Sequence, residues 1–362
     1  MRALPGFFAA DRLRQRRDLS MPHRTFLAFI LPSLIAMILF IAIPILSVAY
    51  QSLHVEHPQV LRTVENCSPF GCTKEVRVDA AAMEQARREQ PMGVFNGLGT
   101  YTNASHLAFD EISRIWAASD SISTAISGVL NLPFYRALTF TLAFTFLVTP
   151  IVIVLGFVIA VAVNAMPGFL KGPVIFFSLL PMIVTPLIGS LVLFWMIDTQ
   201  GVIGATLQKV FDNPQLSLKA SPTLTWAVLF IYGIWHSVPF SFVVFYAGLQ
   251  TVPADTLESA KIDGASRWEQ IRFVVIPYLA PLATFVALIQ LMDNFRVFEP
   301  IVGFSAAANA TSLSYLIYND LRNADAPLFG SAAATSMLTI LGVVTLLTPV
   351  LLRTWRDFHR KA

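Results

Sequence analysis

Long runs of apolar residues dominate this chain, separated by shorter polar segments. Each run reaches the length of about 20 residues that an α-helix needs to cross a hydrocarbon core of ~30 Å. The apolar residues are continuous rather than alternating, and backbone groups in lipid must satisfy one another, so helices are favoured over a closed barrel. The pattern predicts an all-α, polytopic membrane helical bundle. Its six predicted spans cover approximately residues 25–50, 136–165, 173–197, 225–249, 274–298 and 331–352.

The charged residues indicate how the spans are oriented. They make up only 13% of the chain, and the mean hydropathy is +0.64, whereas a soluble domain carries about 25% charged residues. Fourteen Lys and Arg residues lie in the two tails and the segments after spans 2 and 4, against three in the short segments after spans 3 and 5. Basic residues concentrate on the cytoplasmic side, so both termini are expected in the cytoplasm.

This orientation divides the chain into five predicted parts, the third of which is a periplasmic insert. The insert contains a helix-favouring stretch, DAAAMEQARREQ. The parts are a cytoplasmic tail (1–24), the first span (25–53), the insert (54–133), the core transmembrane domain (134–352) and a second cytoplasmic tail (353–362).

The insert holds the two cysteines of the chain, Cys67 and Cys72, within CSPFGC. Disulfides form in oxidising compartments such as the periplasm, and the Pro and Gly between the cysteines allow a tight turn. A local disulfide is therefore predicted. A metal pair or a redox role is the alternative, although no second Cys/His pair stands nearby and no metal site is expected.

A polar stretch between spans 4 and 5 predicts a helix–turn–helix on the cytoplasmic side. In ESAKIDGASRWEQIRFVVIP (258–277), the pattern indicates a short helix over about 255–262 and a second over about 266–276, ending near Pro277. Between them Gly264 supplies a helix stop, because glycine takes the left-handed conformation at low cost.

Capping signals support both helices. Asp255 and Glu258 are spaced like an N-cap and its N3 partner, and Ser266 and Glu269 match a capping box. An ordinary loop that returns the chain to the membrane is the alternative. An apolar stripe for packing on the membrane domain is expected from Trp268, Ile271 and Val275.

The same stretch resembles the EAA motif of the membrane subunits of bacterial ATP-binding cassette (ABC) importers, in their carbohydrate-uptake branch. Two positions depart from that pattern, Ser259 for the first alanine and Ile276 for leucine. The positions that carry the likeness, and that are expected to couple to an ATPase, are Glu258, Ala260, Asp263, Gly264, Ala265 and Pro277.

The resemblance implies a type I ABC importer-like fold, closest to the larger membrane subunit of maltose-type transporters, in the bacterial inner membrane. The short helix would then be a coupling helix seated on a cytoplasmic ATPase, present in two copies that bind ATP and Mg. The chain has no G-x-x-x-x-G-K-[ST] phosphate-binding loop, so it is not expected to be an enzyme or to bind a cofactor itself.

The resemblance also implies a set of partners. A second homologous membrane subunit would complete a heterodimer in the lipid bilayer, and a periplasmic solute-binding protein would deliver a sugar, a polyol or a derivative. The insert would help to grip that binding protein, or else serve as a packing domain or spacer. No nucleic acid partner is expected.

Polar residues inside spans 4 and 5 are candidates for a substrate pathway, because such residues are costly in lipid. Aligning on the motif places several of them where maltose-type subunits hold sugar, and Gln290 and Asn294 share one helix face. Packing within the bundle is the alternative for each. The candidates are Trp235, His236, Ser237, Phe240, Gln290, Asp293, Asn294 and Arg296.

Two further patterns affect the reading of spans 5 and 6. Asp293, Arg296 and Glu299 are spaced by three, so they could neutralise one another, or form the ion relay of an ion-coupled secondary transporter, the competing function. That competitor leaves the cytoplasmic helix–turn–helix unexplained. Small residues over 330–334 are expected to let span 6 pack closely against its neighbours.

Overall fold

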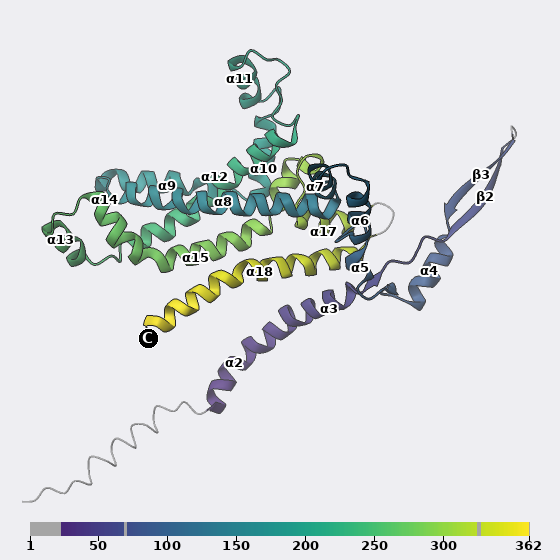
Figure 1. Ribbon diagram of the computed structural model, residues 1–362, viewed down its shortest axis with the longest axis horizontal. Helices are drawn as coiled ribbons and strands as arrows, with labels where there is room; N and C mark the ends of the chain where they lie inside the picture. Colours follow the sequence, from purple (N-terminus) through teal and green to yellow (C-terminus); the bar gives the residue numbers. More distant parts are fainter. Residues whose placement is uncertain (1–22, 69–70, 324–326, 362) are drawn as a thin grey trace, which may run out of the picture. The chain divides into compact units, whose positions relative to one another are not determined.

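The computed structural model describes residues 23–68, 71–323 and 327–361, which form two compact units that divide between Gln51 and Ser52 (Figure 1). The described part of the first unit is one apolar helix with no buried side chain in its most hydrophobic window. It consists of α2 (His23–Met37), the π-helical turn η1 (Ile38–Ala42) and α3 (Ile43–Gln51).

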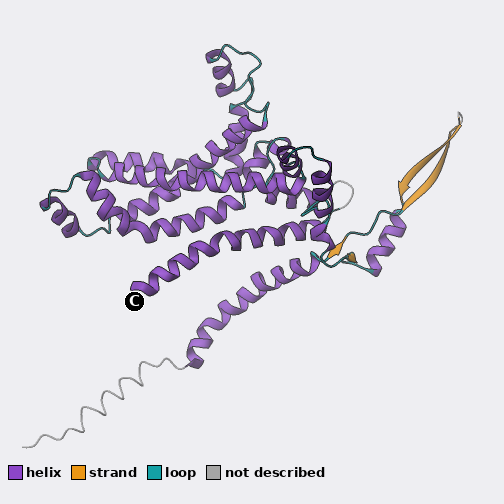
Figure 2. Ribbon diagram, in the orientation of Figure 1, coloured by secondary structure: helices purple, strands orange, loops and turns teal. Residues whose placement is uncertain are grey.

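The second unit begins with the insert, whose described residues carry both short helices and short strands (Figure 2). The predicted helix is present as α4, and Asp79 caps it by accepting from the backbone N–H groups of Ala81 and Ala82. The strands were not predicted. The elements are β1 (His54–Val55), β2 (Leu61–Ser68), β3 (Gly71–Val78), α4 (Ala80–Glu89), β4 (Val94–Phe95), α5 (Gly99–Thr102), α6 (Phe109–Ala118) and α7 (Ile122–Leu130).

The strands form two separate antiparallel pairs. β1 pairs with β4, and β2 pairs with β3 in a hairpin whose register sets Cys67 opposite Cys72. The side chains of both cysteines lie outside the described part of the structure, so the disulfide stays a prediction.

The membrane core follows the insert and confirms the predicted helical bundle. Among the described residues, five helices are long and apolar enough to span a membrane, the helix of the first unit and four in the core. One bent pair in the core brings the number to six. The core elements are α8 (Pro133–Asn164), α9 (Gly168–Ile183), α10 (Pro186–Met196), α11 (Val202–Val210), α12 (Pro222–Leu249), α13 (Ala254–Ile262), α14 (Arg267–Gln270), η2 (Ile271–Val275), α15 (Ile276–Phe295), α16 (Glu299–Gly303), η3 (Ala306–Ala308), α17 (Leu313–Leu321) and α18 (Phe329–Lys361).

The third predicted span is not one helix. α9 and α10 meet at an angle of 93°, and Val184 and Thr185 between them are extended. The cause is Pro186, because the residue before a proline is disfavoured in the helical conformation and the proline itself can begin a new helix. The bend leaves backbone carbonyls without helical partners inside the bundle.

The centre of the bundle is the contact between α8 and α12, where aromatic side chains interlock. The Phe140 ring lies 5.0 Å from that of Trp226 in an edge-to-face arrangement, a geometry that adds to the energy of area burial. In Figure 1, α8, α12 and α15 run alongside one another, with α13 at one end and α7 and α17 at the other.

The small residues at the start of α18 pack closely, as predicted. Ala332, Ala333 and Ala334 are buried, and a side chain at Gly330 would meet the carbonyl oxygen of His54. The beginning of α18 thus packs directly against the insert, which makes the insert continuous with the core.

Candidate functional site

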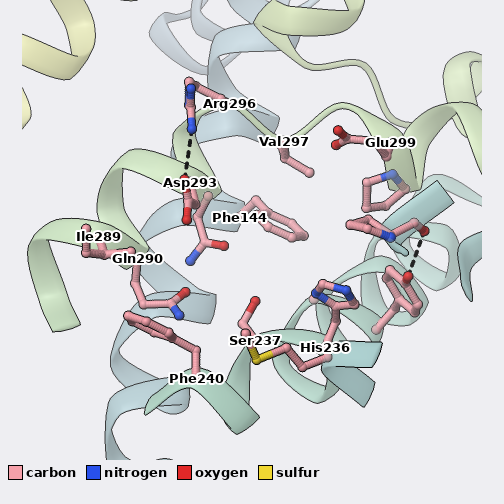
Figure 3. Close-up of a pocket in the computed structure, with 16 residues that line it drawn as sticks. Phe144, His236, Ser237, Phe240, Ile289, Gln290, Asp293, Arg296, Val297 and Glu299 are labelled. Carbon is pink, nitrogen blue, oxygen red and sulfur yellow. Dashed lines mark hydrogen bonds and ion pairs between the residues drawn. The ribbon is translucent and has the colours of Figure 1, made fainter. Parts of the chain in front are cut away.

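A cavity of about 530 Å³ opens inside the bundle, between α8, the α9–α10 bend, α12 and the C-terminal half of α15 (Figure 3). Seven of the eight candidate pathway residues line it. They are His236, Ser237, Phe240, Gln290, Asp293, Asn294 and Arg296.

Trp235, the eighth candidate, does not line this cavity. It lies in a separate, mainly apolar groove of about 480 Å³, formed with α8 and α9 and including Ile151 and Pro181. Successive helix residues point about 100° apart, so Trp235 and Ser237 point in nearly opposite directions. A cavity that Ser237 lines therefore does not include Trp235. A pathway role for Trp235 has no support from the geometry of this cavity.

The bend in span 3 is secured by two side chains of α12. The Tyr232 hydroxyl donates to the carbonyl of Pro186 at 2.7 Å, and His236 Nε2 lies 3.2 Å from the carbonyl of Val184. A carbonyl only accepts, so this contact requires the hydrogen of the imidazole on Nε2. In the neutral ring Nδ1 is then an acceptor. His236 therefore both fixes the bend and lines the cavity.

The two amides of α15 differ in their partners, although both are buried. The side-chain N–H of Asn294 donates to the Thr149 hydroxyl of α8 at 2.9 Å. The structure shows no side-chain hydrogen bond for Gln290, which is 4% exposed and lines the cavity. Asn294 therefore fits the alternative that the polar residue packs within the bundle. Gln290 lines the cavity with an amide that can bind a solute.

The charged residues at the end of α15 do not form the predicted triad. Arg296 pairs with Asp293 at 2.9 Å, but α15 ends at Phe295. Glu299 belongs to the next element, α16, and makes no ion pair among the described residues. Mutual neutralisation is therefore correct for the pair Asp293–Arg296 and wrong for Glu299.

Several lining residues were not recognised in the sequence. Phe144 comes from α8, and Met182 and Pro186 come from the bend. A Cβ at Gly233 would lie 2.5 Å from the Phe144 ring, so the glycine is what allows this ring to lie beside α12. The glycine and the Phe144 ring belong to different spans, so the sequence did not show that they meet.

The helix–turn–helix predicted between spans 4 and 5 is present in the structure. Gly264 has φ +83°, a left-handed conformation that side chains disfavour. The Ser266–Glu269 capping box is complete: Ser266 N–H donates to the Glu269 carboxylate at 2.7 Å, and Glu269 N–H donates to the Ser266 hydroxyl at 3.3 Å. Pro253, rather than Asp255, is the N-cap of α13, so that part of the capping prediction was wrong.

The second predicted helix does not end near Pro277. α14, η2 and α15 continue as one apolar span from Arg267 to Phe295. The π-turn before the proline supplies the room that its ring needs, because a proline clashes with the carbonyl four residues earlier in a regular helix. The first unit has the same arrangement of a π-turn followed by a proline, with η1 just before Pro44.

The coupling positions of the motif form an exposed surface. Glu258, Asp263 and Gly264 are exposed, and a Cβ at Gly264 would meet no atom within 4 Å. Trp268 is 65% exposed and does not pack on the membrane domain as predicted, whereas Val275 is buried. Trp268 lies on α14, two residues after the capping Ser266, and extends the exposed surface instead. The other coupling positions, Ala260, Ala265 and Pro277, lie on the same segment.

A second polar cluster lies where the insert meets α18, and we call it the outer lock: Glu56, His106, Asp320, Ser331 and Thr335. Ser331 donates to Asp320 at 2.7 Å, and Glu56 accepts from the backbone N–H of Gly330 at 2.7 Å. His106 Nε2 lies 3.1 Å from both the Ser331 carbonyl and the Thr335 hydroxyl. This cluster joins the insert to the last span.

Burial changes the ionisation of the outer lock. His106 is 1% exposed, and desolvation lowers the pKa of its ring from 6.5, opposed by the Ser331 carbonyl and the Asp320 carboxylate. Desolvation also raises the pKa of Asp320, opposed by its hydrogen bond from Ser331. Both shifts disfavour charge in this cluster.

Comparisons with known proteins identify a family of membrane transport components, in agreement with the helical bundle and its internal cavity. Residues 121–355 match the model of the family described as "Binding-protein-dependent transport system inner membrane component". The multiple sugar-binding transport system permease protein of Streptococcus mutans is 29% identical over 59% of this chain and 74% of its own. The trehalose transport system permease protein of Mycobacterium tuberculosis is 29% identical over 58% of this chain and 67% of its own. Two further relatives are matched over less than half of their length.

A solved structure shares the fold. The crystal structure of a bacterial ABC transporter involved in the import of the acidic polysaccharide alginate contains a chain that superposes with a TM-score of 0.63. The identity is 18%, over 95% of this chain and 99% of that one.

Proposed function

Because the chain belongs to the family of inner membrane components of binding-protein-dependent transport systems, we propose that it is the permease subunit of an ATP-driven importer. It would carry a sugar or a sugar-like solute, such as a polyol or a derivative, delivered by a periplasmic binding protein. The named relatives support carbohydrate as the substrate class, since one is a multiple-sugar permease and another a trehalose permease.

The observation that carries the proposal is the direct connection between the exposed cytoplasmic surface and the cavity. α13 lies between α12 and α15, the two helices that supply most of the polar lining. From Arg267 to Phe295 the chain is one continuous helical span, so a displacement at Gly264 is transmitted along a rigid element. An ATPase that binds α13 can thereby move the walls of the cavity.

We further propose the partners that this mechanism requires. Two copies of a cytoplasmic ATPase bind ATP and Mg, since the chain has no phosphate-binding loop of its own, and both termini face them. A second, homologous membrane subunit completes a heterodimer. The insert, which is fixed to the last span by the outer lock, helps to hold the binding protein.

Seven of the cavity residues are proposed to form the pathway. Aromatic faces suit the apolar faces of a sugar ring, and amides and hydroxyls suit its hydroxyl groups. Phe240 supplies an aromatic face, although its ring also contacts Phe285. Ser237 and Gln290 supply a hydroxyl and an amide, and neither makes a side-chain hydrogen bond among the described residues. The similar proteins carry names that refer to a neutral sugar in one case and to an acidic polysaccharide in another. Sequence similarity alone therefore does not show whether the solute is charged.

The coupling role is tested by placing a side chain at Gly264. Gly264→Val introduces a β-branched residue at a positive φ, which is strained, on the surface proposed to bind the ATPase. Gly172→Val is the matched control, because a Cβ there also meets no atom within 4 Å and no positive φ is involved. We expect Gly264→Val to lose ATPase co-purification or substrate-stimulated ATP hydrolysis, and Gly172→Val to retain both.

The competing function predicts a different result. An ion-coupled transporter would retain uptake in Gly264→Val vesicles and would respond to a proton or sodium gradient without ATP. Full ATP-driven uptake with normal ATPase association in Gly264→Val would contradict the proposal. The variant must remain folded, as judged by a monodisperse elution profile and an unchanged helical circular dichroism spectrum.

A further inference from the structure

The charges that line the cavity are unequal in sign. Three charged side chains contribute, Asp293, Arg296 and Glu299. Arg296 is the single cation, and it already pairs with Asp293 at 2.9 Å. The Glu299 carboxylate has no cationic partner among the described residues. The lining that this chain supplies therefore carries an excess negative charge.

The position of Glu299 separates it from the ion pair. Figure 3 shows its carboxylate on the other side of the opening from Asp293 and Arg296, on the side of His236. The backbone holds it there, because the Ser190 hydroxyl lies 3.4 Å from the Glu299 carbonyl and Pro300 and Ile301 are buried. The carboxylate itself is exposed to the cavity.

The uncharged groups add further acceptors. His236 is held with Nε2 towards the Val184 carbonyl, which leaves Nδ1 as an acceptor in the neutral ring. One side-chain N–H of Asn294 donates to the Thr149 hydroxyl and is not available to a solute. A solute in this cavity thus meets two carboxylates, a ring nitrogen, a hydroxyl and the two neutral amides of α15. It meets one cation, Arg296, which is already paired with Asp293.

An anionic group would be repelled by this arrangement. A carboxylate or sulfate near Glu299 meets a like charge, and like charges facing each other reduce affinity for the wrong partner. Hydroxyl and ammonium groups, in contrast, donate hydrogen bonds to ionised carboxylates, and these bonds are stronger than neutral ones.

We infer that the cavity selects against anionic sugars, that it takes a neutral or amino sugar, and that Glu299 is the residue that sets this charge preference. The inference rests on the proposed function, because it assigns a substrate class to the cavity of that permease.

The test uses the purified complex with its membrane partner and ATPase in lipid nanodiscs, without the soluble binding protein, whose own selectivity would otherwise intervene. Native mass spectrometry records the solutes retained from three disaccharide mixtures: neutral sugars, 2-amino sugars and uronic acids. The variants are Glu299→Gln and Glu299→Lys. Glu84→Gln is the matched control, because Glu84 lies on α4 of the insert and pairs only with Arg88.

We expect the unaltered complex to retain members of the neutral or amino mixtures and none of the uronic acids. Glu299→Gln should reduce the retained amino sugars relative to neutral ones by about fivefold, the size typical of an exposed charge pair. Glu299→Lys should admit uronic acids. Glu84→Gln should leave the profile unchanged.

Three results would overturn the inference: preferential retention of uronic acids by the unaltered complex, identical profiles for both Glu299 variants and the unaltered complex, or no retained solute from any mixture. ATP-driven uptake measured on the same preparations distinguishes the two levels of the account. Intact uptake with any of these results removes the charge preference and leaves the permease function standing, whereas loss of ATP dependence removes the function itself.

Discussion

The cavity and the outer lock are both polar clusters in an apolar protein, but they differ in how their polar groups are used. In the outer lock, His106, Asp320 and Ser331 all hydrogen-bond to protein groups. In the cavity, Ser237 and Gln290 line open space, and the structure shows no side-chain hydrogen bond for either. A satisfied polar cluster fixes one structure, whereas polar groups that face a cavity are available to a ligand. The difference separates a structural joint from a binding site.

Removal of the His106 ring should have the largest effect on stability and tests whether the outer lock is a structural joint. His106→Ala leaves a void and removes the partner of Thr335, so we expect a loss of about 3 kcal/mol in stability. His57→Ala is the control, because His57 is half-buried and bonds to the Gln90 carbonyl within the insert, outside the outer lock. Thermal unfolding in detergent measures both, and retained solute in native mass spectrometry should not change. An unaffected melting temperature in His106→Ala would show that the cluster is not a joint.

The second largest effect is expected from acidification, which should lower the free energy of unfolding through protonation of His106. The pKa of His106 is lowered in the folded protein, so the unfolded chain binds its proton at higher pH. The stability from this group is complete above pH 6.5 and is lost as the pH falls towards the lowered pKa, by at most about 1.4 kcal/mol per pH unit. Asp320 has the opposite sign: its raised pKa gives a contribution that is complete below pH 3.8 and lost as the pH rises.

Unfolding at pH 7.5 and 5.5 isolates the histidine when it is compared with His106→Asn. The unaltered protein should lose more stability on acidification than the variant. An equal loss in the two proteins would assign the acid sensitivity to other groups.

Matched serine substitutions sharpen the contrast between the clusters. Ser331→Ala removes a hydrogen bond to the half-buried carboxylate of Asp320. It should cost about 1–2 kcal/mol in stability with little effect on solute binding. Ser237→Ala should change the free energy of unfolding by no more than about 0.5 kcal/mol and should lower ATP-driven uptake. Swapped outcomes, with Ser237 controlling stability and Ser331 controlling uptake, would reverse the assignment.

The smallest effect is expected at the insert hairpin. An isolated two-stranded hairpin is marginally stable in water, and the register sets Cys67 opposite Cys72. We predict that the native protein is two hydrogen atoms lighter than the reduced one, and that reduction increases proteolysis between β2 and β3 without changing solute binding. A native mass that equals the reduced mass, or that includes a metal ion, would contradict the disulfide.

The sequence was sufficient for features that depend on neighbouring residues. Apolar runs predicted the spans, Ser266 and Glu269 predicted the capping box, and Gly264 predicted the left-handed turn. These signals lie within one continuous segment of the chain, so no knowledge of tertiary structure was needed.

Features that depend on distant residues were missed. His106 contacts Ser331 from 225 positions away, and no periodicity reveals such a partner. The bend at Pro186 was not predicted, and the sequence indicated one span over about 173–197. The side chains of α12 that bond the freed carbonyls lie more than 40 positions away. The end of α15 before Glu299 likewise depends on how α16 packs, so equal spacing suggested a triad that the fold separates.

The central claim is that α13 controls the cavity, and thiol accessibility tests it most directly. Ser237→Cys, in a variant with both native cysteines replaced by serine, would be exposed to a membrane-impermeant maleimide from the outer side, with and without ATP, in the assembled complex. The account predicts that ATP changes the labelling rate and that adding Gly264→Val abolishes the change. A labelling rate that ignores ATP, or that responds equally in the Gly264→Val background, would contradict the coupling of this surface to the cavity.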